Sequence, residues 1–238
     1  MGNSIGDNPV KLSIVIPSYN EAGTIKQVVE RILNLRLLNV TKEVLVIDDG
    51  STDETPQILK ELNSAQVRII SHARNMGKGF AIRTGIKNAS GDYLIIQDAD
   101  LEQDPSEYVD LLRPLLSGST NVVYGSRFLA STVHTNRLSF WGNRFFNVAV
   151  YVLFRKKLTD MWTGYKIAKL GLWRSITLKT HGFAIEPEIT ARFLLLNEKI
   201  LEVPISFNPR STREGKHIRY RDGIKALLVL FGCRFKLF

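Results

Sequence analysis

Short β-branched runs that alternate with segments of helical spacing dominate the first half of this chain. Polar residues, glycine or proline bound these runs, as is typical of buried parallel strands, and the runs cover residues 12–16, 44–47, 67–70, 93–96 and 122–124. Between the runs, apolar residues recur every three or four positions, as in Ile25, Val28, Val29, Ile32 and Leu33. This alternation predicts an α/β fold in which helices flank a mostly parallel, Rossmann-like sheet.

The rhythm changes after Arg127. The spacing there predicts a helix over about 136–154, a loop through 163–165, a helix over about 187–196, a strand over 200–207 and a C-terminal amphipathic helix over 220–238. A chain of 238 residues is long enough for one sizeable core. We therefore predict a single domain over residues 1–238, with residues 1–10 as a flexible tail.

The chain is basic, with a formal net charge of +9, and it holds one cysteine, Cys233. The charge indicates an anionic partner, which the composition leaves open between nucleic acid, a diphosphate and an acidic membrane. Basic residues are concentrated after Pro209, so we expect the anion to meet that end of the chain. A single cysteine excludes a disulfide within the chain and agrees with a reducing compartment.

Two aspartates follow the predicted strand 93–96, at Asp98 and Asp100. Ligands of doubly wound sheets bind at the carboxyl ends of the strands, and alternate side chains of an extended segment point to the same side. Asp98 and Asp100, with Glu102 beyond them, supply the oxygen ligands that Mg²⁺ or Mn²⁺ prefers, and diphosphate oxygens and waters would complete the shell. An Asp-x-Asp pair alone also occurs in helix caps and loops.

Polar residues also follow the first two predicted strands. After residues 12–16, the ring of Tyr19 could lie against a nucleobase and the carboxylate of Glu21 could accept from base N–H groups, although this segment also suits the start of a helix. After residues 44–47, capping does not explain why Asp48 and Asp49 adjoin, because like charges repel unless a donor or cation offsets them. We interpret Asp49 as a ribose or base ligand.

Residues 74–79 read Arg-Asn-Met-Gly-Lys-Gly and lack the spacing of a P-loop, so we do not predict an ATPase. The motifs of this chain, in this order, resemble the family 2 glycosyltransferases of the GT-A fold. The resemblance rests first on residues 16–21, 46–51, 74–79 and 98–100. The second half resembles the dolichyl-phosphate mannose synthase branch through residues 125–127, 160–166, 182–188 and 202–205, and the likeness extends from about residue 12 to 235.

The resemblance implies site residues. For the nucleotide sugar these are Pro17, Tyr19, Glu21, Ile47, Asp49, Asp98, Ala99, Asp100, Arg127, Arg210 and Lys216. It also assigns Asp98, Asp100 and Arg127 to catalysis, and the metal, Mg²⁺ or Mn²⁺, to Asp98, Asp100 and Glu102. Some family members carry Gln where this chain has Glu102.

The implied reaction is an inverting, metal-dependent transfer of a hexose, foremost mannose from GDP-mannose, to a polyprenyl or dolichyl monophosphate. A phosphate monoester is mostly dianionic at neutral pH and needs no general base, which agrees with the lack of an obvious histidine catalyst. We expect His72 and His181, like the other two histidines, to have surface or structural roles. Arg137 and Arg144 are candidates for the acceptor phosphate, or else belong to a solvated helix face.

Three alternatives remain. The donor could be UDP-glucose, because the motifs define a diphosphate site better than a base or a sugar. The acceptor could be a saccharide hydroxyl, which would need a base, and Glu186 or Glu188 is the place to look. The chain could also be a catalytically silent, membrane-associated subunit that binds a nucleotide sugar. We do not expect nucleic-acid binding.

Two apolar runs, 145–154 and 226–231, are shorter than the roughly 20 residues that span a bilayer. We expect residues 145–154 and the helix 224–238 to supply an apolar groove and a membrane-facing surface, with core packing of Leu227, Leu228 and Leu230 as the alternative. Together with the basic C-terminal residues, this predicts a peripheral protein on the cytoplasmic face of an anionic membrane, with or without a separate membrane subunit.

Overall fold

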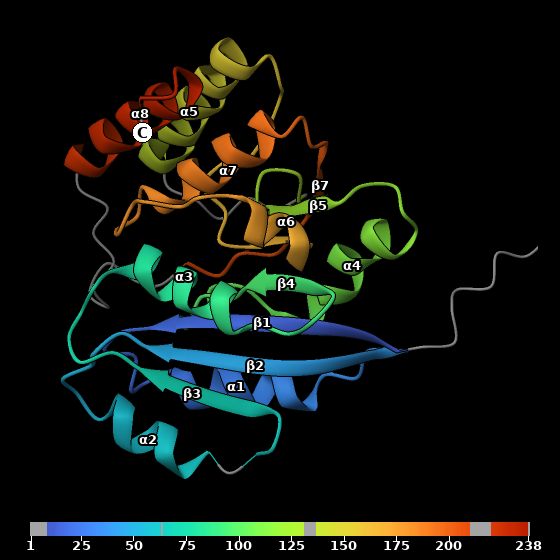
Figure 1. Ribbon diagram of the computed structural model, residues 1–238, viewed down its shortest axis with the longest axis vertical. Coiled ribbons are helices and arrows are strands. Elements are labelled where there is room, and N and C mark those ends of the chain that lie inside the picture. Colours follow the sequence, from blue (N-terminus) through green and yellow to red (C-terminus); the bar gives the residue numbers. More distant parts are fainter. Residues whose placement is uncertain (1–8, 63, 131–136, 210–219, 238) are drawn as a thin grey trace, which may run out of the picture.

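The protein is organised around a mostly parallel β-sheet. The computed structural model describes residues 9–62, 64–130, 137–209 and 220–237. In that part of the chain the strands are β1 (Val10–Ser18), β2 (Val40–Asp48), β3 (Val67–Ser71), β4 (Tyr93–Ile96), β5 (Val122–Ser126), β6 (Lys166–Lys169) and β7 (Ile200–Pro204). They form one seven-stranded sheet in the order β3-β2-β1-β4-β6-β5-β7 (Figure 1). Among the strands of the described residues, only β6 runs antiparallel to its neighbours, β4 and β5.

Helices connect the strands and cover both faces of the sheet. They are α1 (Ile25–Asn34), α2 (Thr55–Glu61), α3 (Lys78–Asn88), a 3₁₀ turn (Pro105–Glu107), α4 (Tyr108–Leu116), α5 (Arg137–Phe154), α6 (Leu170–Ser175), α7 (Ile185–Leu195) and α8 (Tyr220–Arg234). Buried residues of α1, α2 and α4 share one apolar cluster with β1 and β2. Those of α3, α6 and α7 share another cluster with the opposite face of the sheet. The predicted α/β fold is therefore confirmed.

The buried runs explain why the central strands form. Ile14, Val15 and Ile16 of β1 have no exposed surface, as expected for a strand covered by helices on both faces. The apolar stripe predicted for the first helix is also found, because Ile25 and Ile32 of α1 are fully buried. Amphipathic spacing thus sets which side of α1 meets the sheet.

Two elements were not predicted, and some boundaries differ. The strand β6 has only four residues, with lysine at each end, and the short helix α6 follows it directly. The strand predicted over 200–207 ends at Pro204, and the chain then runs toward the loop after β4, where Asn208 N donates to Glu102 O at 2.9 Å. The predicted tail falls largely on residues 1–8, which lie outside the described residues.

The last helices form an outer layer. Helices α5 and α8 lie beyond α7 on the side away from the sheet (Figure 1). Phe146 and Val150 of α5 and Ala226, Leu230 and Cys233 of α8 are buried together with α7 in a third apolar cluster. Within the described residues, no helix combines the length and hydropathy needed to cross a membrane.

Candidate active site

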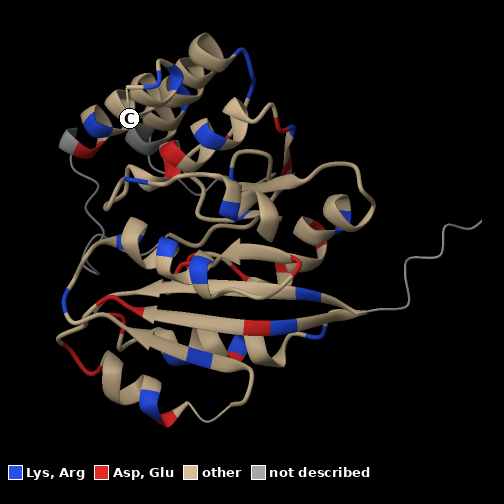
Figure 2. Cartoon of the chain, viewed as in Figure 1, with Lys and Arg blue, Asp and Glu red and all other residues tan. Residues whose placement is uncertain are grey.

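The carboxyl ends of the parallel strands bring several of the predicted site residues to one edge of the sheet. Strands β2, β1 and β4 are parallel neighbours, so Asp48, Ser18 and the segment after Ile96 end at the same edge. Strand β5 is parallel to these strands across the antiparallel β6, so Arg127 follows it at that edge as well. Acidic residues gather where β2 and β4 end (Figure 2). This edge is the candidate active site.

Residues of the β2–α2 loop and the first residue of α2 hold the loop after β1. Asn20 adopts a left-handed conformation with φ of 54°. Its backbone N donates to Ser51 Oγ at 3.0 Å, and its side-chain oxygen accepts from Thr52 N at 2.8 Å. Glu21 N donates to Thr55 Oγ1 at 2.9 Å. These bonds place Tyr19, which is 42% exposed, at the rim of the site.

The register of β1 and β2 brings two predicted nucleotide-binding residues side by side. Pro17 lies opposite Ile47 in this pair of parallel strands. Ile47 is fully buried, whereas Pro17 is only partly covered. Their contribution to nucleotide binding stays a prediction.

Protein donors offset the adjacent charges of Asp48 and Asp49. Asp48 Oδ1 accepts from Ser51 N at 3.1 Å. Asp49 accepts from Met76 N at 3.0 Å and from Gly77 N at 2.7 Å, and it contacts His72 Nδ1 at 2.6 Å. The second aspartate therefore fixes the loop before α3, a role that the sequence did not reveal. Its predicted contact with the nucleoside stays a prediction.

The two histidines near this loop are engaged in structural contacts. The other ring nitrogen of His72 contacts Thr84 Oγ1 at 3.0 Å. His181 Nδ1 lies 3.3 Å from Met76 O. Gly77 adopts φ of 92°, and an added Cβ would lie 2.4 Å from His181 O. The structural role expected for His72 and His181 agrees with these contacts.

A chain of alternating charges extends from Asp98 into the protein. Lys78 Nζ lies 2.7 Å from Asp98 Oδ1 and 2.9 Å from Glu186 Oε1. The second oxygen of Glu186 forms an ion pair with Lys166, which is fully buried. Lys78 begins α3, Glu186 lies in the first turn of α7, and Lys166 begins β6. The antiparallel direction of β6 is what places Lys166 at this edge.

The two lysines of this chain differ in their pKa. Burial by itself lowers the pKa of Lys78, but the carboxylates of Asp98 and Glu186 outweigh this effect and raise it above its ordinary value. Burial lowers the pKa of Lys166, and the Glu186 carboxylate offsets only part of that effect. Lys78 is therefore a permanent positive charge next to Asp98 at neutral pH.

Arg127 forms a bidentate ion pair with Asp160. Its Nε donates to Asp160 Oδ2 at 2.7 Å and its Nη2 donates to Asp160 Oδ1 at 2.8 Å. The guanidinium carbon also lies 4.9 Å from the centre of the Phe207 ring. Burial lowers the pKa of Arg127, but Asp160, Glu102 and Asp98 raise it above its usual value. Arg127, which follows β5, is thus within electrostatic reach of the acidic segment, and its contact with the donor phosphates stays a prediction.

Side chains from two elements, β7 and α5, hold the loop that carries Asp160. Glu202 of β7 accepts from Thr159 N at 2.8 Å and from Asp160 N at 2.9 Å. Asn143 and Asn147 of α5 donate to Thr159 O at 2.7 and 2.6 Å. Burial raises the pKa of Glu202, although these backbone donors oppose the change. The position of Arg127 therefore depends on α5 and β7.

The two carboxylates considered as general bases are committed to protein partners. Glu186 lies between Lys78 and Lys166. Glu188 accepts from Lys179 N at 3.0 Å and from Thr180 N and Thr180 Oγ1 at 2.8 and 2.7 Å. This geometry gives no support to a hydroxyl acceptor that would need a base.

The acidic segment after β4 has the chemistry of a cation site that is shared with a substrate. Asp100 and Glu102 are 9% and 5% exposed, and Glu102 N donates to Asp100 Oδ1 at 3.2 Å. No group of three or more His, Cys, Asp or Glu in the described part of the chain is arranged to hold a metal ion. Mg²⁺ and Mn²⁺ need only one or two carboxylates where substrate phosphates supply further oxygens. The donor set therefore fits such a cation, and Glu102 as third ligand stays a prediction.

Several predicted binding residues are not placed by the structure. Arg210 and Lys216 lie outside the described residues, and so does the side chain of Arg137. Arg144 is described and is exposed on α5. The phosphate contacts assigned to these four residues stay predictions.

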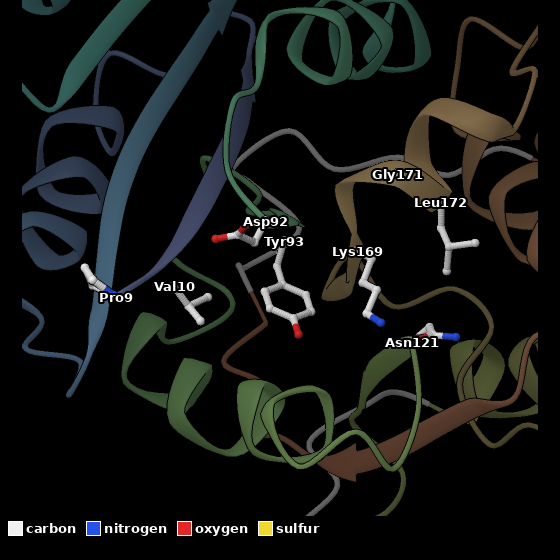
Figure 3. Close-up of a pocket in the computed structure, with 8 residues that line it drawn as sticks. All are labelled: Pro9, Val10, Asp92, Tyr93, Asn121, Lys169, Gly171 and Leu172. Carbon is white, nitrogen blue, oxygen red and sulfur yellow. The ribbon is translucent and has the colours of Figure 1, made fainter. Parts of the chain in front are cut away.

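A cavity of about 740 Å³ lies at the opposite edge of the sheet (Figure 3). Its lining includes Val10 and Tyr93, which begin β1 and β4, and Lys169, which ends β6. None of the predicted site residues lines it. The carboxyl edge, and not this cavity, holds the chemistry described above.

No role was predicted for Lys78 or Asp160, although both lie in motifs that carry the family resemblance. Lys78 did carry a physical signal. It begins a helix, where the helix dipole disfavours a positive charge unless anions lie close by. A lysine at that position therefore pointed to acidic partners from elsewhere in the chain.

Comparison with known proteins gives two curated relatives at equal identity. The dolichol-phosphate mannosyltransferase of Pyrococcus furiosus is 30% identical over 213 residues, which are 87% of this chain and 59% of that protein. The dolichyl-phosphate beta-glucosyltransferase of Saccharomyces cerevisiae is 30% identical over 85% of this chain and 68% of its own length. This chain thus spans only part of the length of either relative.

The fold and the family are also matched. The crystal structure of glucosyl-3-phosphoglycerate synthase from Mycobacterium tuberculosis in complex with UDP superposes with a TM-score of 0.75 at 21% identity. The match covers 99% of this chain and 86% of that one, so the GT-A-like fold is shared. Residues 13–174 match the family described as Glycosyl transferase family 2. On this evidence the chain is a glycosyltransferase of family 2.

Proposed function

We propose that this chain transfers a hexose from a nucleoside diphosphate sugar to a polyprenyl monophosphate such as dolichyl phosphate. The observation that carries the proposal is the position of Asp98 and Asp100 at the carboxyl edge, with Lys78 and Arg127 within electrostatic reach of Asp98. The names of two relatives, each 30% identical, support a dolichyl phosphate acceptor. Both relatives are longer than the region that matches this chain, so their names describe more than the part that this chain shares.

Mannose from GDP-mannose is the donor we propose first, because the motifs of the second half resemble the mannose synthase branch. Glucose from UDP-glucose is the second candidate. It is supported by the yeast dolichyl-phosphate beta-glucosyltransferase, which is as similar to this chain as the archaeal mannosyltransferase is.

The proposal includes a divalent cation, Mg²⁺ or Mn²⁺. A crystal structure of the mycobacterial glucosyl-3-phosphoglycerate synthase, which has a similar fold, is a complex with Mn²⁺ and UDP-glucose, and this supports such a cofactor in this fold. Asp98 and Asp100 would hold the cation here. When bound, it would neutralise part of the negative charge on the leaving diphosphate.

The reaction we propose is a direct displacement. A phosphate oxygen of the acceptor attacks the anomeric carbon, and the bond from that carbon to the diphosphate oxygen breaks. The electron pair leaves with the nucleoside diphosphate, so an α-linked donor gives a β-linked product. The acceptor phosphate has a second pKa of about 6 and needs no base at neutral pH. The commitment of Glu186 and Glu188 to protein partners supports this route.

The charges of the site suit two anionic substrates. Lys78 offsets Asp98 and Glu186, and Arg127 offsets Asp160. Without these pairs, buried carboxylates would repel both the donor diphosphate and the acceptor phosphate. We infer that the ion pairs tune the charge of the site so that both anions can approach.

A panel of labelled donors tests the proposal. Purified protein is incubated with Mg²⁺ or Mn²⁺, a polyprenyl phosphate and radiolabelled GDP-mannose or UDP-glucose, and label is counted in the lipid extract. We expect label to be transferred from one donor, and we expect Asp100→Ala to abolish the transfer. Asp110→Ala on α4, where Asp110 forms an exposed pair with Arg113, is the matched control and should retain it.

The possible results separate the alternatives. Transfer from UDP-glucose alone would remove the mannose assignment but keep the reaction class. Tight binding of GDP or UDP without transfer from any donor would favour a catalytically silent, nucleotide-sugar-binding subunit.

A further inference from the structure

The imidazole of His72 lies between the end of β2 and helix α3, and its side chain is 11% exposed. One ring nitrogen, Nδ1, lies 2.6 Å from Asp49 Oδ1, and the other, Nε2, lies 3.0 Å from Thr84 Oγ1 of α3. The rings of His72 and Phe80 pack edge to face, with their centres 4.9 Å apart. Contacts with three residues therefore set the orientation of this imidazole.

The contact with Asp49 decides which ring nitrogen carries a proton. A carboxylate only accepts hydrogen bonds, so Nδ1 of His72 donates to Asp49 Oδ1. Nε2 accepts from the Thr84 hydroxyl when the ring is neutral and donates to it when the ring is charged, because a hydroxyl can do both. The hydrogen bond from Nδ1 therefore persists in both protonation states of the ring.

Asp49 uses the same carboxylate to hold the loop before α3. Its Oδ2 accepts from Gly77 N at 2.7 Å, and Met76 N lies 3.0 Å from Oδ1 and 3.1 Å from Oδ2. One carboxylate thus engages two consecutive backbone N–H groups and the imidazole. A carboxylate offers about four acceptor positions, so these three donors leave about one for a ligand.

The loop that Asp49 holds is also confined by close backbone contacts. Gly50 adopts φ of 72°, and a Cβ added there would lie 2.5 Å from the backbone carbonyl carbon of Arg74. On the other side of the loop, Gly79 N donates to His181 O at 2.6 Å. The end of β2 and the segment before α7 therefore limit how far residues 74–77 can move.

This loop joins two parts of the candidate active site. Lys78 comes directly after Gly77, and its ammonium group lies 2.7 Å from Asp98. Asp49 follows β2 and is predicted to contact the nucleoside, whereas Asp98 follows β4 and is predicted to hold the cation. A change in the position of the Asp49 carboxylate would move the two amides it binds and, with them, Lys78.

We propose that His72 is a positioning residue, whose Nδ1–H orients the Asp49 carboxylate so that Asp49 holds the loop that presents Lys78 to Asp98. The consequence for nucleotide affinity rests on the proposed function, because nucleotide binding at this edge is part of it. The consequence for the loop does not. A role in packing alone would not depend on where the side chain carries its N–H group.

Asparagine and glutamine separate the two nitrogens of His72. The side-chain NH₂ of asparagine can replace the Nδ1–H donor, whereas the NH₂ of glutamine lies closer to the position of Nε2. We expect His72→Asn to bind GDP or UDP with Mn²⁺ within about threefold of the wild type, and His72→Gln to bind at least about tenfold more weakly, because it loses a hydrogen bond to a charged group. Titration calorimetry measures both affinities.

Amide hydrogen exchange tests the loop without any ligand. The amides of Met76 and Gly77 should exchange at least about tenfold faster in His72→Gln than in the wild type, and at close to the wild-type rate in His72→Asn. Long-range ¹H–¹⁵N correlation spectra of the wild type should show a proton on Nδ1 of His72. Thr84→Val is the matched control, because it removes only the partner of Nε2, and it should leave affinity and exchange unchanged. Thermal melting shows that each variant is folded.

Three results would overturn the proposal. The first is an equal loss of nucleotide affinity and loop protection in folded His72→Asn and His72→Gln, which would indicate packing alone. The second is wild-type exchange of both amides in His72→Gln. The third is a wild-type ring with its proton on Nε2 only. If the wild type binds neither GDP nor UDP, the proposed function fails, whereas the exchange rates and the ring tautomer still decide the role of His72.

Discussion

The ammonium group of Lys78 lies 2.7 Å from a carboxylate oxygen of Asp98, where α3 begins and β4 has just ended. The same ammonium group lies 2.9 Å from Glu186 of α7. One cation therefore holds together the acidic segment after β4 and the start of a helix from the second half of the chain. The acidic site and the C-terminal helices are joined by this ion pair as well as by apolar packing.

Lys78→Met should destabilise the protein strongly. It removes the cation between two carboxylates, of which Glu186 is 4% exposed, and leaves them in a poorly solvated site. Breaking a buried ion pair costs about 3–5 kcal/mol, and urea unfolding measures this loss. Arg113→Met, which removes an exposed pair on α4, should cost less than about 1 kcal/mol.

A double-mutant cycle separates the ion pair from packing. Adding Glu186→Gln to Lys78→Met should recover part of the loss, with a coupling energy of about 1–3 kcal/mol. Losses for Lys78→Met no larger than those for Arg113→Met would contradict a stabilising role for this pair.

Asp160→Asn should also destabilise the protein, by about 3 kcal/mol. Asparagine keeps an oxygen that can accept from Arg127. It removes the negative charge of Asp160, however, and the side chain of Asp160 has no exposed surface. The buried guanidinium then lacks its ionic partner. Denaturant unfolding of Asp160→Asn against Asp110→Asn, an exposed matched change, measures the difference. Equal denaturant midpoints of unfolding for the two variants would show that the charge of Asp160 does not stabilise the protein.

The local part of the fold could be predicted from sequence. The runs at 12–16 and 93–96 are buried on both faces, and such strands need continuous apolar residues, which are visible in any short window. Asp98 and Asp100 were found in the same way, because strand ends of a doubly wound sheet meet at one edge. The constraint in each case lies within a few residues of the sequence.

Contacts between distant segments could not be predicted. The strand β6 has four residues and is defined by its pairing with β4 and β5, not by its own pattern. The backbone donors of Asp49 come from a separate loop, so the sequence left a nucleoside as the best explanation of its charge. The side-chain partners that come from distant segments depend on tertiary packing. The composition and spacing of a short stretch of sequence do not reveal them.

The C-terminal helix shows why two interpretations remained open. Core packing and membrane contact were both compatible with Leu228 and Leu230. The structure buries Leu230 completely and leaves Leu228 62% exposed. Helix α8 has apolar residues on two faces, and a sequence window does not tell which face meets the core.

Glu43 should make stability dependent on pH in the acid range. Although burial favours the neutral form, hydrogen bonds from Ser13, Ser90 and Lys11 lower the pKa of Glu43 to about 2. A carboxylate whose pKa is lowered on folding contributes stability above its ordinary value of 4.5 and loses it as the pH falls toward 2. After allowance for solvent screening, we expect a contribution of about 1–2 kcal/mol at pH 6.

Urea unfolding at several pH values checks this prediction. The stability difference between wild type and Glu43→Gln should be largest near neutral pH and should shrink as the pH falls below about 4.5. Glu30→Gln on the exposed face of α1 is the matched substitution. A difference between wild type and Glu43→Gln that stays constant with pH would rule out the ionised form as the source of stability.

Gly164→Ala should impair the site while it largely preserves the fold. An added Cβ at Gly164 would lie 2.4 Å from Asp98 Oδ2 and 3.0 Å from Gln103 Oε1. Both atoms are ends of side chains, so Asp98 can rotate away at a cost of about 1–3 kcal/mol. If Asp98 helps to hold a cation and a diphosphate, moving its carboxylate should weaken binding of GDP or UDP with Mn²⁺ at least about tenfold.

Titration calorimetry measures this affinity. Gly171→Ala in α6 is the matched control, because its Cβ would meet no heavy atom within 4 Å, and it should bind as the wild type does. Unchanged affinity in a folded Gly164→Ala protein would mean that the Asp98 carboxylate takes no part in binding the diphosphate.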